Sequence, residues 1–192
     1  GITIHCILGN HDTYYRNTNK VNSLREVFSN TDSFRIYEKP ELVRLDGIPF
    51  SFVPWINKEN YEEAVEFIKH KSANYLCGHF ELNGYEVMRG VKFDGGMDPS
   101  LIAKYSMVLS GHFHSKQTKG NVHYLGTQYQ LTFSDLNERK GFHVFDTSTT
   151  DLEFIENERR LFHSFVYDDE AVDAMQYMTA DYSDYKDKFV KV

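Results

Sequence analysis

Two histidines one residue apart follow a glycine in the stretch Gly111-His112-Phe113-His114. The apolar run 106–110 before them predicts a buried strand. In an extended or turning backbone the side chains of residues i and i+2 point in the same general direction, and glycine permits an unusual backbone angle at such a turn. Histidine is the commonest metal ligand but is also frequent in loops, so this pair alone fits either a metal site or a plain surface turn.

The same arrangement occurs at two other predicted strand ends. The apolar run Ile2–Leu8 is typical of a strand buried on both faces of a sheet, and Gly9-Asn10-His11-Asp12 follows it. The run 73–77 is another short strand, and Gly78-His79-Phe80 ends it. In open α/β sheets ligands bind at the carboxyl ends of the strands, so three such turns would converge at one edge. Their side chains are of the types that bind metal ions, and together they predict a metal centre.

The elements around these turns indicate an α/β fold. Helical spacing covers 21–28 and 57–70, and Asp98-Pro99 is a start signal for a helix through Tyr105. Strands are expected at 34–38, 41–45, 48–53, 106–110, 116–119, 121–125, 141–146, 152–155 and finally 161–167. Residues 81–97 are expected to form a long loop, and loops of this length usually carry function. Strands and helices alternate in the first half, which favours a layered sheet, whereas the part after residue 106 consists mainly of strands.

Composition is that of an ordinary globular chain, and its charge is unevenly distributed. The 192 residues carry a net charge of −7, and residues 151–192 account for most of it with 11 acidic and 5 basic side chains. The remainder is nearly neutral, and such a surface accepts a polyanion when divalent cations are bound. Two cysteines, Cys6 and Cys77, are too few for a disulfide framework and are expected to be buried free thiols.

The two ends of the chain suggest a piece of a longer protein. Gly1 stands directly inside a strand pattern, and the last residues are charged and rich in tyrosine. No apolar run is long enough to span a bilayer and no signal peptide is recognisable, so we expect no membrane association and a cytoplasmic location.

The order GNHD, GH and GHFH resembles the calcineurin-like metallophosphoesterase superfamily. More narrowly, the chain is similar to DNA double-strand-break repair nucleases of the SbcD type, with the closest likeness to recombination nuclease subunits encoded by phages. The likeness extends over about residues 1–167 and includes Val53-Pro54-Trp55, the stretch 78–84, Tyr124–Thr127 and Gly141–Thr147. A phage-encoded protein of this kind would work in the host cytoplasm.

This resemblance implies a fold and a set of roles. The fold would be a layered αββα metallophosphoesterase sandwich lacking its first strands, with a partial nuclease domain at 1–160 and the start of a truncated cap or DNA-recognition region at 161–192. Two divalent cations are implied, manganese in this branch with magnesium as the alternative. Asn10, His79 and His112 would bind one ion and His114 the other. His11 would act on the scissile phosphate as proton donor or charge stabiliser, and Asp12 would orient it.

The resemblance also implies that the ligand set in this chain is incomplete. The family's Asp-x-His and Gly-Asp-x-x-Asp motifs precede the GNH strand, with which this chain begins, so the bridging carboxylate is missing. The parent is therefore expected to be a DNA exonuclease or endonuclease of repair and recombination, whereas this chain is expected to be weakly active or inactive. An SMC-like ATPase partner and a homodimer are further implications. Two alternatives stay open: a phosphoesterase acting on small phosphate esters or cyclic nucleotides, and a non-catalytic binding fragment.

Four residues after GNHD are candidates for contact with DNA. They are Tyr14, Tyr15, Arg16 and Lys20, whose rings and charges could stack on bases or pair with the phosphate backbone. An ordinary polar loop is the equal alternative. Trp55 is expected in the core, and His5, His123 and His143 are expected to be structural. For the tyrosine-rich tail, a poorly packed helix is favoured over the beginning of a DNA-recognition cap.

Overall fold

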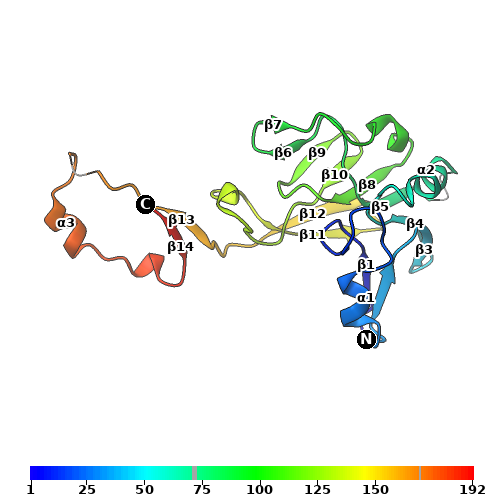
Figure 1. Cartoon of the computed structure of the whole chain (residues 1–192), viewed down its shortest axis with the longest axis horizontal. Helices are drawn as coiled ribbons and strands as arrows, with labels where there is room; N and C mark the ends of the chain where they lie inside the picture. Colours follow the sequence, from blue (N-terminus) through cyan, green and yellow to red (C-terminus); the bar gives the residue numbers. More distant parts are fainter. Residues whose placement is uncertain (71–72, 169) are drawn as a thin grey trace. The chain divides into compact units, whose positions relative to one another are not determined.

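The structure is a computed structural model that describes residues 1–70, 73–168 and 170–192 (Figure 1). It is mixed α/β with few helices, as the sequence predicts at the level of fold class. The contacts divide the chain into two compact units, one comprising 1–126 with 147–149 and the other 127–146 with 150–192. The expected domain boundary at residue 160 remains a prediction. Among helices in the described ranges, none is long and apolar enough to cross a membrane.

A six-stranded mixed sheet forms the centre of the first unit (Figure 1). In spatial order its strands are β3 (Glu41–Leu45), β4 (Ile48–Val53), β5 (Tyr75–His79), β8 (Met107–Gly111), β10 (Val122–Tyr124) and β9 (Gln117–Lys119). The four inner strands run parallel, and β3 and β9 are antiparallel edge strands. The predicted hairpin turn between β3 and β4 is confirmed, since Asp46 and Gly47 both have positive φ angles, 49° and 84°.

Short helices contribute to the core of this unit. Helix α2 (Tyr61–His70) buries Ala64 and Ile68 in the same cluster as Ile102 of the 3-10 helix η1 (Pro99–Ile102). The helix predicted from residue 57 begins only at Tyr61, because the Asn57 N–H donates to Asn60 Oδ1 at 2.8 Å and forms a local turn instead. The expected cap of η1 is confirmed, since Asp98 accepts from Ser100 N at 2.8 Å, although η1 ends before Tyr105. Helix α1 spans Ser23–Phe28.

The first strand is less buried than its apolar sequence predicts. Strand β1 (Ile4–Ile7) pairs in parallel with β2 (Phe34–Tyr37) in a separate two-stranded sheet. Ile4 is 43% exposed, so the expectation of burial on both faces is wrong for the described residues, because within them β1 forms strand pairs with β2 alone. His5 is structural as predicted, since its Nδ1 lies 2.7 Å from the Tyr37 hydroxyl.

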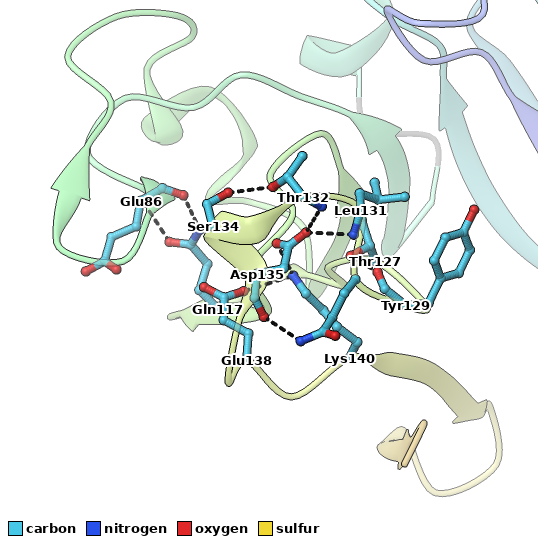
Figure 2. Close-up of polar contacts among 11 residues, drawn as sticks. Glu86, Gln117, Thr127, Tyr129, Leu131, Thr132, Ser134, Asp135, Glu138 and Lys140 are labelled. Carbon is cyan, nitrogen blue, oxygen red and sulfur yellow. Dashed lines mark hydrogen bonds and ion pairs between the residues drawn. The ribbon is translucent and has the colours of Figure 1, made fainter. Parts of the chain in front are cut away.

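The segment 81–97 is more ordered than a plain loop. It contains a small antiparallel hairpin of β6 (Glu86–Met88) and β7 (Val91–Lys92). The Gln117 side chain fixes β6, because it accepts from Glu86 N at 2.8 Å and donates to Glu86 O at 2.7 Å (Figure 2). The sequence does not predict this hairpin, because its strands are too short to show a clear alternation of apolar and polar residues.

The second unit contains two pairs of strands and little helix. Strands β11 (Gly141–Asp146) and β12 (Asp151–Glu156) form the predicted antiparallel hairpin. Strand β13 (Phe162–Ser164) was expected to be longer and the last, but it pairs in parallel with β14 (Phe189–Lys191). Between them lie the exposed helix α3 (Ala174–Thr179) and the 3-10 helix η3 (Ser183–Tyr185), and the 3-10 helix η2 (Phe133–Asp135) precedes β11.

A buried ion pair anchors the segment that precedes β11 (Figure 2). Lys140 Nζ lies 2.8 Å from Asp135 Oδ1, and the two side chains are 1% and 4% exposed. The other carboxylate oxygen accepts from Leu131 N at 2.8 Å and Thr132 N at 3.0 Å. Burial by itself raises the pKa of Asp135, but Lys140 and the two backbone donors outweigh it and leave the pKa below its usual value.

We predict that Asp135→Asn destabilises the chain by about 1.5–3 kcal/mol, because the buried Lys140 ammonium then keeps only one carboxylate partner, Glu138 Oε2 at 2.9 Å. Urea unfolding at pH 7 measures the effect. Since the folded-state pKa of Asp135 is lowered, its stabilisation is present above the ordinary aspartate pKa of about 4 and is lost as the pH falls below that value. The exposed control Glu158→Gln should change stability by less than about 0.5 kcal/mol. Equal stabilities of Asp135→Asn and the wild type would contradict this account.

Candidate functional site

Three adjacent parallel strands deliver polar and aromatic side chains to one edge of the central sheet. Strand β5 ends at His79, which pairs in register with Gly111 of β8, and His112 follows. Val53, the last residue of β4, pairs with Gly78, so Trp55 follows the third strand at the same edge. Because these strands are parallel, their carboxyl ends meet there, which is where ligands bind in open α/β sheets.

The end of β1 reaches the same place. The Leu8 carbonyl accepts from Trp55 N at 2.8 Å, which ties the turn after β1 to the end of β4. Asn10 Oδ1 then lies 2.8 Å from His79 Nε2, and this nitrogen lies 3.3 Å from His112 Nδ1. Three of the four residues expected to bind metal are therefore in direct contact, although they are up to 102 positions apart in the sequence.

Burial keeps the two central imidazoles neutral. Burial first, and then the nearby imidazoles of His112, His11 and His114, together lower the pKa of His79 to about 3. Burial also lowers the pKa of His112 to about 4, again with His11 and His114 contributing. These effects place His11 and His114 within electrostatic range of the pair. Neutral imidazole is the form that binds a metal ion, because its unprotonated nitrogen has a free lone pair.

The donor set suits a divalent cation but is small. It consists of two imidazole nitrogens and the amide oxygen of Asn10, which are accepted ligands for divalent metals of this kind. Across the described ranges, no group of three or more His, Cys, Asp and Glu side chains is arranged to hold a metal ion. The Nε2–H of His79 has two acceptors in its reach, Asn10 Oδ1 and His112 Nδ1. A cation bound among the three atoms would take the place of that proton.

Two of the strand-end glycines make room for the His79 ring. A Cβ on Gly9 would lie 2.8 Å from His79 Cε1, and a Cβ on Gly111 would lie 2.9 Å from His79 Nδ1. The turn at Gly111 was expected to need an unusual backbone angle there, but the positive φ, 91°, belongs to His112. The glycines are thus required for close packing rather than for conformational freedom.

His112 is held in its strained backbone conformation from two sides. Its ring stacks on Trp55 with centroids 5.6 Å apart and planes 15° apart. Its Nε2 lies 3.1 Å from Glu81 Oε1, and a carboxylate there fixes the proton on Nε2. Nδ1, which faces His79, is then the unprotonated nitrogen. Carboxylate partners of this kind orient and tune metal-binding histidines.

Trp55 and Glu81 are the site residues that the sequence did not predict. Trp55, expected in the core, is only partly buried and lies against His112. Its position directly after β4, at the same sheet edge as the glycine turns, is the sequence feature that could have identified it as a site residue. Glu81 follows the Gly78-His79-Phe80 turn by one residue, and no property of its own marked it.

Asp12 closes the turn that presents Asn10. Its Oδ2 accepts from Gly9 N at 2.7 Å, and its own N–H donates to the Gly9 carbonyl at 3.2 Å. This carboxylate therefore stabilises the local turn, and its expected role of orienting His11 remains a prediction. His11 itself is exposed.

The four candidate DNA contacts lie on the exposed loop that follows. Tyr14 is 77% exposed and meets Tyr15 edge to face, with centroids 4.8 Å apart. Arg16 is also exposed, and Lys20 forms an ion pair with Glu59. The two rings and Arg16 remain available at the surface, whereas part of the charge of Lys20 is already balanced.

We predict that Gly9→Ala and Gly111→Ala each displace the His79 ring, because their methyl groups would overlap it. Overpacking of this kind costs about 1–3 kcal/mol. Thermal unfolding gives the cost, and nitrogen NMR of the imidazole rings reports the displacement. Gly95→Ala is the matched control, since its Cβ would meet nothing nearer than 3.4 Å and its φ is not positive. Unchanged His79 resonances in both variants would show that the glycines are not needed for the ring.

A second prediction concerns the tautomer of His112. With Glu81 in place, imidazole NMR of the metal-free chain should show the proton on Nε2. Glu81→Leu removes the acceptor and should shift the population towards Nδ1–H, whereas Glu81→Gln keeps an acceptor oxygen and should retain the original tautomer. Identical spectra for all three proteins would contradict the role assigned to Glu81.

Comparison with known proteins gives one informative match. No protein-family model matches the chain. The chain is 40% identical over 169 residues to exonuclease subunit 1 of Enterobacteria phage T4. This alignment includes 86% of the chain and 50% of the phage protein, so the chain spans about half the length of the curated relative it matches.

Proposed function

We propose that this chain carries part of the catalytic site of a metal-dependent DNA nuclease that hydrolyses phosphodiester bonds in recombination and repair. The observation that carries the proposal is the convergence of Asn10, His79 and His112 at the carboxyl edge of the sheet. The likeness to a phage exonuclease subunit supports it independently. In finer terms we assign the chain to the calcineurin-like metallophosphoesterases of the SbcD type, with the layered sandwich fold of that superfamily.

The proposed cofactor is a pair of divalent cations, manganese first and magnesium second. Asn10, His79 and His112 would hold one ion, and His114 would contribute to the other. When bound, such ions supply Lewis acidity towards the phosphate oxygens and lower the pKa of water for in-line attack. The chain contributes a neutral, preformed set of donors, because burial keeps the pKa values of His79 and His112 far below 7.

We assign His11 the role of proton donor to the leaving oxygen, or of charge stabiliser beside the phosphate. It follows Asn10 directly and lies within electrostatic range of both buried imidazoles. Asp12 holds the turn from which His11 projects. Imidazole is the side chain that most often transfers protons in general acid–base catalysis.

DNA is the proposed substrate, and Tyr14, Tyr15, Arg16 and Lys20 are its proposed contacts beside the site. Exposed rings stack on bases with little sequence preference, and cationic side chains pair with phosphates. The matched relative is named as a subunit, which supports action in a complex. We propose an SMC-like ATPase and a second copy of the protein as its partners, and the cytoplasm of the phage host as the location.

A manganese titration followed by calorimetry tests the metal site. We expect Mn²⁺ to bind, and His79→Asn to weaken the affinity at least about tenfold, because it removes the central nitrogen donor. His70→Asn is the matched control, since this histidine is exposed at the end of α2 and should leave affinity unchanged. Absence of any Mn²⁺ binding by the wild type would favour a non-catalytic binding role instead.

A cleavage assay then tests the substrate. With Mn²⁺, linear duplex DNA should be shortened slowly, and His11→Asn should abolish the reaction without changing Mn²⁺ affinity. A slow rate is expected because the proposed ligands Asn10, His79, His112 and His114 include no carboxylate to balance the charge of the cations. Hydrolysis of bis(p-nitrophenyl) phosphate without any action on DNA would instead support a phosphoesterase for small esters.

A further inference from the structure

A small cavity adjoins the candidate metal site. Its volume is about 250 Å³, below the 300 Å³ or so at which pockets for drug-sized ligands begin. Trp55, Tyr61 and Phe80 supply aromatic walls, and Ile56 and Met97 add apolar surface. A cavity of this size and lining suits one flat ring system rather than an extended ligand.

The charge of the cavity excludes a phosphate. Glu81 is the acidic residue in its wall, and none of the described residues that line it is Lys or Arg. Its Oε1 lies 3.1 Å from His112 Nε2, at the side of the cavity that faces the histidines. An anionic ligand would be repelled here, whereas an uncharged ring meets an apolar surface with a hydrogen-bond acceptor at its side.

The cavity shares two residues with the candidate metal site. His79 belongs both to the cavity wall and to the proposed ligand set, with its Nε2 on Asn10 Oδ1. Trp55 likewise lines the cavity and stacks on His112. A single ligand could therefore place a phosphate at the histidines and a ring in the cavity. One nucleotide has this form, because its sugar joins a phosphate on one side to a base on the other.

Two aromatic side chains of the wall, Trp55 and Tyr61, supply stacking partners for a ring. The Trp55 ring is fixed in orientation by the parallel His112 ring, so it loses little freedom when a ligand binds. Tyr61 opens helix α2 and is 56% exposed, so its ring lies where an incoming group can reach it. Base–aromatic stacking is tolerant of sequence because every base has a π-face.

We propose that this cavity binds the nucleobase of a strand-terminal nucleotide, unstacked from its neighbour, while the adjacent phosphate lies at the histidines. The proposal rests on the proposed nuclease function and adds the form of the substrate: a DNA end whose last base has left the duplex stack. Enzymes that act on an unstacked base hold it between aromatic and apolar side chains, and the wall of this cavity contains residues of both kinds. Ends that fray or carry a single-stranded overhang are then better ligands than blunt ends rich in G·C pairs.

Trp55 is the single tryptophan of the chain, so its fluorescence tests the proposal directly. Titration with deoxyadenosine and with dAMP should quench the emission, whereas deoxyribose 5-phosphate, which has no base, should not. Tyr61→Leu should weaken binding of both base-containing ligands at least about fivefold, from the loss of one stacking partner. Tyr61→Phe keeps the ring and should bind like the wild type, and Tyr129→Leu serves as an exposed tyrosine control in the other unit.

Each outcome bears on one of the two proposals. Quenching by deoxyadenosine supports the base cavity even if the chain cleaves no DNA, because a nucleoside has no phosphate. Equal responses to dAMP and to deoxyribose 5-phosphate would overturn the base cavity and leave the phosphate chemistry intact. Affinity unchanged by Tyr61→Leu would also overturn it, as would an equal loss in Tyr129→Leu.

Discussion

The packing of one buried imidazole determines how the candidate site is built. The His79 ring occupies space that a Cβ on Gly9 or on Gly111 would need. Gly111 ends β8 of the central sheet and Gly9 follows β1 of the two-stranded sheet, so the ends of strands from two sheets place the ring. From this position Nε2 meets both Asn10 and His112. A larger residue at either glycine would move the ring and separate all three groups.

Burial of this ring also determines its chemistry. A histidine removed from water is costly to protonate, and neighbouring imidazoles increase the cost, so the pKa of His79 falls to about 3. The group is thereby kept in its metal-binding form at neutral pH. The same ring closes one side of an aromatic cavity, so a group bound to the metal and a group bound in the cavity would be held next to each other.

Much of the site could be predicted from sequence because it depends on local rules. Apolar runs followed by glycine and a ligand-type side chain placed Asn10, His79 and His112 at strand ends, and parallel strands bring such ends together. Trp55 and Glu81 could not be predicted in the same way, because their contacts with His112 depend on the register of β4, β5 and β8. The exposure of β1 and the hairpin within 81–97 also depend on pairing, which local apolar patterns do not encode.

The central claim is that Asn10 Oδ1, His79 Nε2 and His112 Nδ1 bind one divalent cation. A crystal structure of the chain grown with Mn²⁺, with anomalous diffraction recorded near the manganese absorption edge, tests it most directly. The account predicts an anomalous peak in contact with all three atoms and with Glu81 still on His112 Nε2. A peak elsewhere in the first unit, with the three side chains still bonded to one another, would contradict it.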